Sequence, residues 1–344
     1  MRRRMVALAT IVMVVLGLAG AGSSPLQAQS FFAGKTVRII VGLAPGGGFD
    51  TYARLVARHL GKHIPGSPAI IVENMTGAGG LIAANHLYRV AKPDGLSLAH
   101  FPGTLVLGQV LGQPGIEFDA RKFELIGATV KEEVVCSVTK ASGITSVEQL
   151  MSAKTPVKIG AVAPGAPTDN TPRILKAALG LPIQVVTGYK GTAEIRLAAE
   201  SGEVAGACWA WESMRATWRK SLDAGEAIPI LQVTSKPLPG LSRVPLAIGL
   251  AKTDEARRLI QVGIQDGSAY SRPFMAPPGT PKERVQILRK AFQETLNDKA
   301  LLAEAEKAKL TLDPVAGEEL EKMIADLFTL DPSFVEKLKA VLYK

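Results

Sequence analysis

The sequence predicts an α/β fold in which two similar segments face each other across a cleft. Strand-like, β-branched runs alternate with helical patterns at the spacing of right-handed βαβ units, which build parallel sheets. The alternation occurs twice along the chain, and each half places a turn rich in glycine and proline between a strand and a helix. With 344 residues, 47% of them apolar, the chain is long enough for two domains with a sizeable core.

The N-terminus predicts a signal peptide over residues 1–28. Three arginines at positions 2–4 precede an apolar stretch from Met5 to Gly20, and small and turn-forming residues lead to Ala28. A membrane anchor is the alternative, but the unbroken apolar run is shorter than the roughly 18–20 residues that a membrane span needs. We therefore expect cleavage after Ala28 and a soluble, periplasmic protein, which we expect to be a monomer.

Charge, histidines and cysteines exclude several classes of function. The formal net charge is +9, but the charges are interspersed, whereas a nucleic-acid surface would cluster them. The four histidines and two cysteines lack metal-ligand spacing, so we predict no metal and no cofactor. Export permits a disulfide between Cys136 and Cys208. Buried free thiols are an equal alternative, because sequence cannot show that the two side chains meet.

The first half of the chain predicts three strands and two helices. The β-branched run from Val37 to Val41 is typical of a buried strand, and the apolar positions that follow repeat at helical spacing. The expected strands are 37–41, 69–74 and the end of 93–101, and the expected helices are 50–60 and 81–90.

The second half repeats this organisation. A strand-rich stretch from Leu125 to Val138 precedes a short helix that Ser146 caps. The further expected strands are 157–162, 183–189, 203–210 and 228–234, and the further expected helices are 171–179 and 192–201.

The C-terminal third predicts amphipathic helices that pack on one domain. Thr280 is a candidate N-cap, Pro281 suits the first helical position and Glu283 completes a capping box. Further helices are expected over 301–310 and 317–330.

The segment "VGLAPGGGFDTYARL", Val41 to Leu55, places three glycines between a strand and a helix. A Walker loop would close on Gly-Lys-Ser/Thr and a dinucleotide turn would read G-x-G-x-x-G, but neither is present, and Asp50 would repel a pyrophosphate. Two readings remain. Either the glycines expose backbone N–H groups to a small anion at a helix N-terminus, or they only permit a tight turn. A second such loop at Gly160–Asn170 favours a cleft between two domains.

Several ordered motifs resemble one family. "KTVRIIVGLAPGGGFDTYARLVARHL", "IIVENMTGAGGLIAANHLY", "KPDGLSLAHF", "GYKGTAEIRLAAESGEVAG" and "APPGTPKERVQILRKAF" are similar, in this order, to the solute-binding receptors of tripartite tricarboxylate transporters, the Bug or TctC family. The resemblance implies a type II periplasmic binding-protein fold with two domains, a ligand cleft and hinge strands. It also implies capture of a small organic acid for inner-membrane permease subunits. We expect domain 1 over 31–127 and 236–344, and domain 2 over 128–235.

The resemblance also implies where the ligand binds, mainly through backbone amides and hydroxyls of the loops after the first strands. The residues carried over are Pro45, Gly46, Gly47, Gly48, Phe49, Asp50, Pro102, Gly103, Thr104, Pro164, Gly165, Ala166, Thr168, Asp169, Tyr189, Lys190 and Gly191.

The chain departs from the family pattern at several of these positions. Phe49 stands where Ser or Thr is common, Asp169 lies near the position of the family's histidine, and Trp209 and Trp211 add aromatic surface. One hypothesis is a ligand whose apolar or aromatic portion packs on Phe49 and Trp209, with a carboxylate at Gly46–Gly48. The alternative is that the tryptophans are core residues.

Nothing in the sequence indicates catalysis. There is no G-x-S-x-G elbow, His100 reads as a strand residue, and the pair Glu132-Glu133 reads as a solvated surface. The expected function is therefore binding rather than chemistry. A ligand sensor that docks a signalling partner is the alternative on the same fold.

Overall fold

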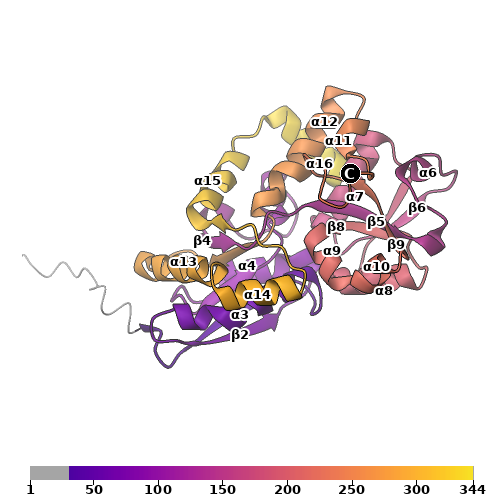
Figure 1. Ribbon diagram of the computed structural model, residues 1–344. Coiled ribbons are helices and arrows are strands. Elements are labelled where there is room, and N and C mark those ends of the chain that lie inside the picture. Colours follow the sequence, from indigo (N-terminus) through magenta and orange to yellow (C-terminus); the bar gives the residue numbers. More distant parts are fainter. Residues whose placement is uncertain (1–30, 344) are drawn as a thin grey trace, which may run out of the picture.

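The computed structural model describes residues 31–343, so the predicted signal peptide lies outside the described residues. Two β-sheets, each flanked by helices, form two lobes (Figure 1). We call the six-stranded sheet with its helices the first lobe, and the five-stranded sheet with its helices the second lobe. The predicted α/β architecture of two segments is confirmed.

The first lobe contains the strands expected from the first half of the chain. β1 (Thr36–Val41) pairs in parallel with β2 (Ala69–Asn74) and β3 (Ser97–His100). β10 (Pro273–Ala276) runs antiparallel to β3 and β4, and β11 (Val315–Ala316) pairs antiparallel with β4 (Glu124–Ala128). The helices that follow the parallel strands are α3 (Gly48–Leu60), α4 (Leu81–Arg89) and α5 (Thr104–Val110).

The second lobe repeats the arrangement on a smaller scale. β6 (Val157–Gly160) pairs in parallel with β7 (Ile183–Val186) and β8 (Gly206–Ala210). β5 (Val134–Thr139) lies antiparallel between β8 and β9 (Ala227–Gln232). Its helices are α6 (Val147–Met151), α7 (Pro167–Leu179), α8 (Thr192–Glu200), α9 (Trp211–Thr217) and α10 (Arg219–Asp223).

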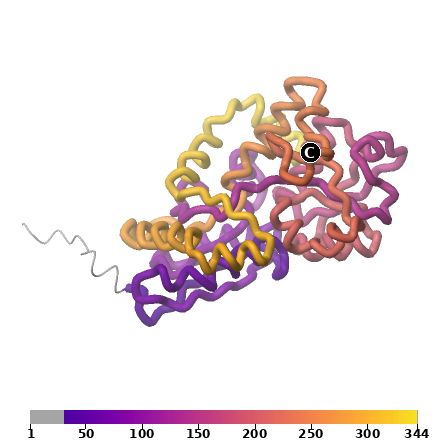
Figure 2. The backbone as a smooth tube through the Cα atoms, in the orientation of Figure 1, coloured from indigo at the N-terminus to yellow at the C-terminus, as the bar shows by residue number. Residues whose placement is uncertain are grey.

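The helices after β9 are shared between the lobes. α13 (Lys282–Leu296) and α14 (Lys299–Lys307) contact α3, and α15 (Gly317–Leu327) contacts β4 of the first lobe. α12 (Asp254–Ile260), which follows α11 (Ala247–Leu250), and the unpredicted α16 (Pro332–Tyr343) contact α7 of the second lobe. Figure 2 follows the C-terminal chain from the first lobe onto the second. The prediction that the C-terminal helices all pack on one domain is therefore wrong, because they pack on both lobes.

One predicted helix cap is confirmed and one is wrong. The Ser146 side chain accepts a hydrogen bond from the backbone N–H of Gln149, as a cap should. Thr280 does not cap α13, because its hydroxyl donates to the carbonyl of Pro277 at 2.8 Å and the helix begins only at Lys282. The turn before the helix therefore uses the hydroxyl that the predicted capping box needed.

The chain crosses between the sheets at two neighbouring segments. The strand-rich stretch 125–138 is two strands in different sheets, β4 and β5, joined by residues 129–133. The chain returns to the first sheet through residues 266–272, which enter β10. The two crossing segments are hydrogen bonded to each other: the N–H of Glu132 donates to the carbonyl of Ser268 (3.0 Å), and the hydroxyl of Ser268 donates to the carbonyl of Glu132 (2.7 Å).

Cys136 and Cys208 form a disulfide, which resolves the alternative left open by the sequence. The two residues are direct partners in the antiparallel register of β5 and β8, with their Cα atoms 3.9 Å apart. Both are buried, so the bond lies inside the second lobe.

Candidate functional site

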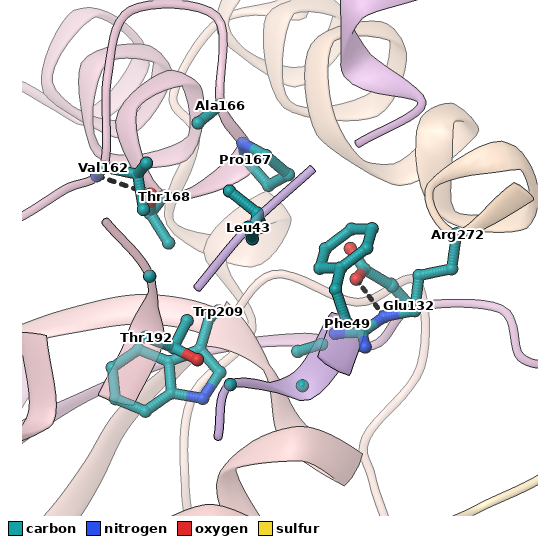
Figure 3. A pocket seen from close by; sticks show the side chains of 14 residues that line it. Leu43, Phe49, Glu132, Val162, Ala166, Pro167, Thr168, Thr192, Trp209 and Arg272 are labelled. Atoms are coloured by element: carbon teal, nitrogen blue, oxygen red, sulfur yellow. Dashed lines mark hydrogen bonds and ion pairs between the residues drawn. The ribbon is translucent and has the colours of Figure 1, made fainter. Parts of the chain in front are cut away.

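A small cavity lies between the lobes, against the two crossing segments (Figure 3). Its volume is about 30 Å³, which leaves room for only about two water molecules. The lining residues come from both lobes and both crossing segments: Leu43, Gly47, Gly48, Phe49, Glu132, Val162, Ala166, Pro167, Thr168, Gly191, Thr192, Trp209, Ala210 and Arg272.

Three helices begin at this cavity. The residues that precede α3, α7 and α8 are Gly47, Ala166 and Gly191, and all three line it. Glycine and alanine have no polar side chain with which to cap a helix, so the first N–H groups of α3 and α8 keep hydrogen-bonding capacity. α7 offers fewer donors, because its first residue, Pro167, has no N–H. The helix dipoles add partial positive charge at the same place, and together they favour an anion.

The glycines before α3 allow the two lobes to approach each other closely. A Cβ on Gly47 would lie 3.0 Å from the hydroxyl oxygen of Thr192 in the second lobe. A Cβ on Gly48 would overlap the side chain of Ser213 and lie 2.9 Å from Nη1 of Arg272. Gly46 has a φ of 78°, which a residue with a side chain adopts only at a cost. The triple glycine therefore serves a turn and a close approach at once.

The structure brings seven of the predicted site residues to the cavity. They are Gly47, Gly48, Phe49, Ala166, Thr168, Gly191 and Trp209. The other predicted residues do not line it in this conformation: Pro45, Gly46, Asp50, Pro102, Gly103, Thr104, Pro164, Gly165, Asp169, Tyr189 and Lys190.

The two predicted acids instead hold the loops in place. The N–H of Gly46 donates to Oδ2 of Asp50 (2.9 Å), and Asp50 also forms an ion pair with Arg54 (2.9 Å). Although burial raises the pKa of Asp50, the hydrogen bonds from Arg54 and Gly46 outweigh it and leave this pKa below its ordinary value. Asp169 is fully buried and is paired with Arg173 at 2.9 Å. Both carboxylates thus have protein partners.

Other predicted residues join the lobes to each other. The hydroxyl of Thr104 donates to the carbonyl of Gly165 at 2.8 Å, and the N–H of Ala44 donates to the carbonyl of Lys190 at 3.1 Å. These bonds connect the loops after the first-lobe strands with the loops of the second lobe.

The aromatic residues have two roles. Trp209 is 3% exposed and stacks on Trp218 with ring centroids 5.2 Å apart, while Phe49 is 6% exposed and packs against His100. Both nevertheless present a face to the cavity, so each is a core residue and part of its wall. His100 ends β3, as expected for a strand residue, and burial lowers its pKa to about 3, which keeps the ring uncharged.

Sequence reasoning missed the buried charges of the site. The interpretation of Glu132-Glu133 as a solvated surface is right for Glu133 but wrong for Glu132, which is buried and lines the cavity. Arg272, also buried, donates from Nε to Glu132 and from Nη2 to Ser213 Oγ (2.7 Å). Its guanidinium stacks on the ring of Phe49. No local pattern links Glu132 to an arginine 140 positions away.

Several polar atoms at or beside the cavity have no hydrogen-bond partner among residues 31–343. They are Trp209 Nε1, Thr192 Oγ1, Arg272 Nη1 and both carboxyl oxygens of Glu212. Burial raises the pKa of Glu212 to about 8, in spite of Arg272, and the nearby Glu132 adds to the shift. Glu212 is therefore mostly uncharged at neutral pH.

Residues 52–339 match the tripartite tricarboxylate transporter family receptor. The chain belongs to this family. The resemblance inferred from the sequence motifs is thereby confirmed, and the family is one of solute-binding receptors.

A curated relative and two solved structures are similar to this chain. A UPF0065 protein of Agrobacterium vitis is 31% identical over 170 residues, and the match covers 48% of each chain, so this chain matches only about half of that relative's length. The periplasmic binding protein BugD has a TM-score of 0.73 at 20% identity, over 90% of this chain and 98% of its own. MatC of Rhodopseudomonas palustris with bound malate has a TM-score of 0.70 at 21% identity, over 90% of this chain and 100% of its own. These structures establish the type II periplasmic binding-protein fold.

Two kinds of feature are absent from residues 31–343. No cluster of histidine, cysteine, aspartate or glutamate in this range has the arrangement of a metal site. Within the same range, no helix has both the length and the apolar character that a membrane crossing requires.

Proposed function

We propose that this protein is an exported solute-binding receptor that captures a small organic acid and delivers it to a tripartite tricarboxylate-type permease. The observation that carries this proposal is the convergence of three helix N-termini, those of α3, α7 and α8, on one cavity between two lobes. Backbone donors at such termini suit a carboxylate. The bound malate in the related fold of MatC supports the same ligand class.

The ligand lies between the residues that precede these helices and the aromatic wall. Its carboxylate accepts hydrogen bonds from the glycine turn at Gly47–Gly48 and from the start of α8, where the hydroxyl of Thr192 has no partner among the described residues. Its apolar portion packs on Phe49 and Trp209, which give the cavity most of its aromatic surface. Burial of this portion contributes about 25 cal/mol to the free energy of binding for each Å² of apolar surface removed from water.

Capture requires the lobes to open and close. A cavity of about 30 Å³ is too small for an organic acid together with its contacts, so the ligand enters when the lobes separate. The crossing segments 129–133 and 266–272 act as the hinge, because they join the two sheets. The chain also connects the two lobes a third time, between α15 and α16. A ligand that contacts both lobes stabilises the closed form by its greater affinity for that form.

The remaining parts of the proposal follow from the family. Residues 1–28 direct export and are removed, and the mature protein works in the periplasm as a monomer. Its domain 1 comprises residues 31–127 and 236–344, and its domain 2 comprises residues 128–235. Packing of α12 and α16 on α7 means that part of the second stretch of domain 1 moves with domain 2.

Calorimetric titration of the mature protein tests this function. Small organic acids should bind, and uncharged analogues such as the corresponding amides should not. Gly47→Val should weaken binding by at least about tenfold, because its side chain crowds Thr192 and the backbone donors. Gly249→Val is the matched control, since nothing lies within 4 Å of a Cβ there. Equal affinity of Gly47→Val and the unaltered protein would show that the ligand binds elsewhere.

A further inference from the structure

The cavity has two unlike ends. Figure 3 shows the indole nitrogen of Trp209 and the hydroxyl of Thr192 on one side, and Arg272, Glu132 and Phe49 on the other. The first end offers uncharged donors that have no partner among the described residues. The second end holds the only charged side chains that line the cavity within residues 31–343, Glu132 and Arg272.

The positive charge at the second end, that of Arg272, is already paired with protein groups. Arg272 donates from Nε to Glu132 and from Nη2 to Ser213, and its guanidinium is stacked on Phe49 and Tyr52. Its Nη1 has no partner in the described chain and lies beside Gly48, at 2.9 Å from where a Cβ on that residue would be. Two of the three guanidinium nitrogens are therefore already paired with protein groups, and the charge of Arg272 is balanced by Glu132.

Acidic groups outnumber basic ones around this arginine. Oε1 of Glu212 lies 3.9 Å from Arg272 Nε, so two buried carboxyl groups face one guanidinium. Burial raises the pKa of Glu212, and the neighbouring charge of Glu132 adds to this shift, although Arg272 opposes it. A further negative charge placed here would lie next to Glu132, whose charge already balances that of Arg272.

We propose that the site selects acids with a single carboxylate and an uncharged, mainly apolar remainder, and discriminates against dicarboxylates. The carboxylate lies by the Thr192 hydroxyl, and the remainder extends from the Trp209 ring along Phe49 towards Glu132. A second carboxylate at the Glu132 end would be buried next to a like charge, which is strongly unfavourable away from water. This inference rests on the proposed function and names the ligand class of the same site.

Pairs of acids that differ by one carboxylate test the inference on the unaltered protein at pH 7. Suitable pairs are butyrate with succinate, hexanoate with adipate, and benzoate with terephthalate, compared by calorimetric titration. In each pair that binds, the monocarboxylate should bind at least about tenfold more tightly. Equal or tighter binding of the dicarboxylates overturns the inference but leaves the proposed function intact. Failure of all six acids to bind overturns both.

Glu132→Gln tests the cause of the selectivity. Loss of this charge should reduce the ratio of monocarboxylate affinity to dicarboxylate affinity by about tenfold. Glu133→Gln is the matched control, because it removes the same charge from the exposed neighbouring residue and should leave the difference unchanged. A Glu132→Gln protein that folds, by circular dichroism, and keeps the full difference overturns the assignment to Glu132. If this variant fails to fold, the titrations of the acid pairs with the unaltered protein still test the inference.

Discussion

The hydroxyl of Thr104 in the first lobe donates a hydrogen bond to the carbonyl of Gly165 in the second lobe, at 2.8 Å. Both residues were predicted to contact the ligand, and in this structure they contact each other. The bond joins the start of α5 to the loop before α7 and is made only while the lobes are together. It therefore stabilises the closed form, on which ligand retention depends in the proposed function.

Thr104→Val should weaken ligand binding, although Thr104 does not line the cavity. Loss of a hydrogen bond between the lobes costs about 1 kcal/mol, which corresponds to about fivefold in affinity. Calorimetric titration with the tightest-binding acid measures the change. Thr329→Val is the control, because the Thr329 hydroxyl bonds only to the nearby carbonyl of Asp326. Undiminished affinity in Thr104→Val would mean that this bond does not contribute to closure.

The disulfide between Cys136 and Cys208 should contribute substantially to the stability of the second lobe. It closes a loop with a sequence separation of 72 residues, and its removal should lower the free energy of unfolding by about 4 kcal/mol. Urea denaturation with and without a thiol reductant measures this loss. The double variant Cys136→Ala, Cys208→Ala should be equally destabilised and no longer respond to the reductant. A reductant effect that persists in the double variant would contradict the assignment.

Glu212 should make the protein less stable as the pH rises. Its pKa is raised from 4.5 to about 8 in the folded state, so between these values the folded protein holds a proton that the unfolded chain has lost. The stability contributed by the protonated side chain is complete below pH 4.5 and is lost as the pH approaches 8. The free energy of unfolding should fall by up to about 1.4 kcal/mol per pH unit from this group.

The variant Glu212→Gln measures the contribution of Glu212 to the pH dependence of stability. Its free energy of unfolding, relative to that of the unaltered protein, should rise between pH 5 and pH 8 and level off above pH 8, as followed by urea denaturation at several pH values. The variant must be compared with the unaltered protein, because His100 changes the free energy of unfolding with pH in the opposite direction. Its pKa of about 3 makes stability rise with pH up to its ordinary value of 6.5. The exposed Glu319→Gln is the control, and a parallel pH profile for Glu212→Gln would refute the prediction.

Local patterns predicted most of the secondary structure. The strand 69–74 was predicted to the residue, and α3 begins only two residues before its predicted start. Strand alternation, helical spacing and the Ser146 cap depend on neighbours within a few positions, and these are visible in the chain. The error at Thr280 is local, because its hydroxyl donates to the carbonyl of Pro277, three residues before it. The error over 125–138 arose from distant contacts, because this stretch divides between two sheets.

The sequence by itself determined the strand–turn–helix units, the position of the glycine turn before α3 and, through the ordered motifs, the family. Only the tertiary structure decided which residues meet. It paired Cys136 with Cys208, buried Glu132 against Arg272, and turned Thr104 towards Gly165 rather than into the cavity. The physical reason is range: propensity and periodicity act over one turn or one strand, whereas ion pairing and burial depend on packing between segments that lie far apart in the chain.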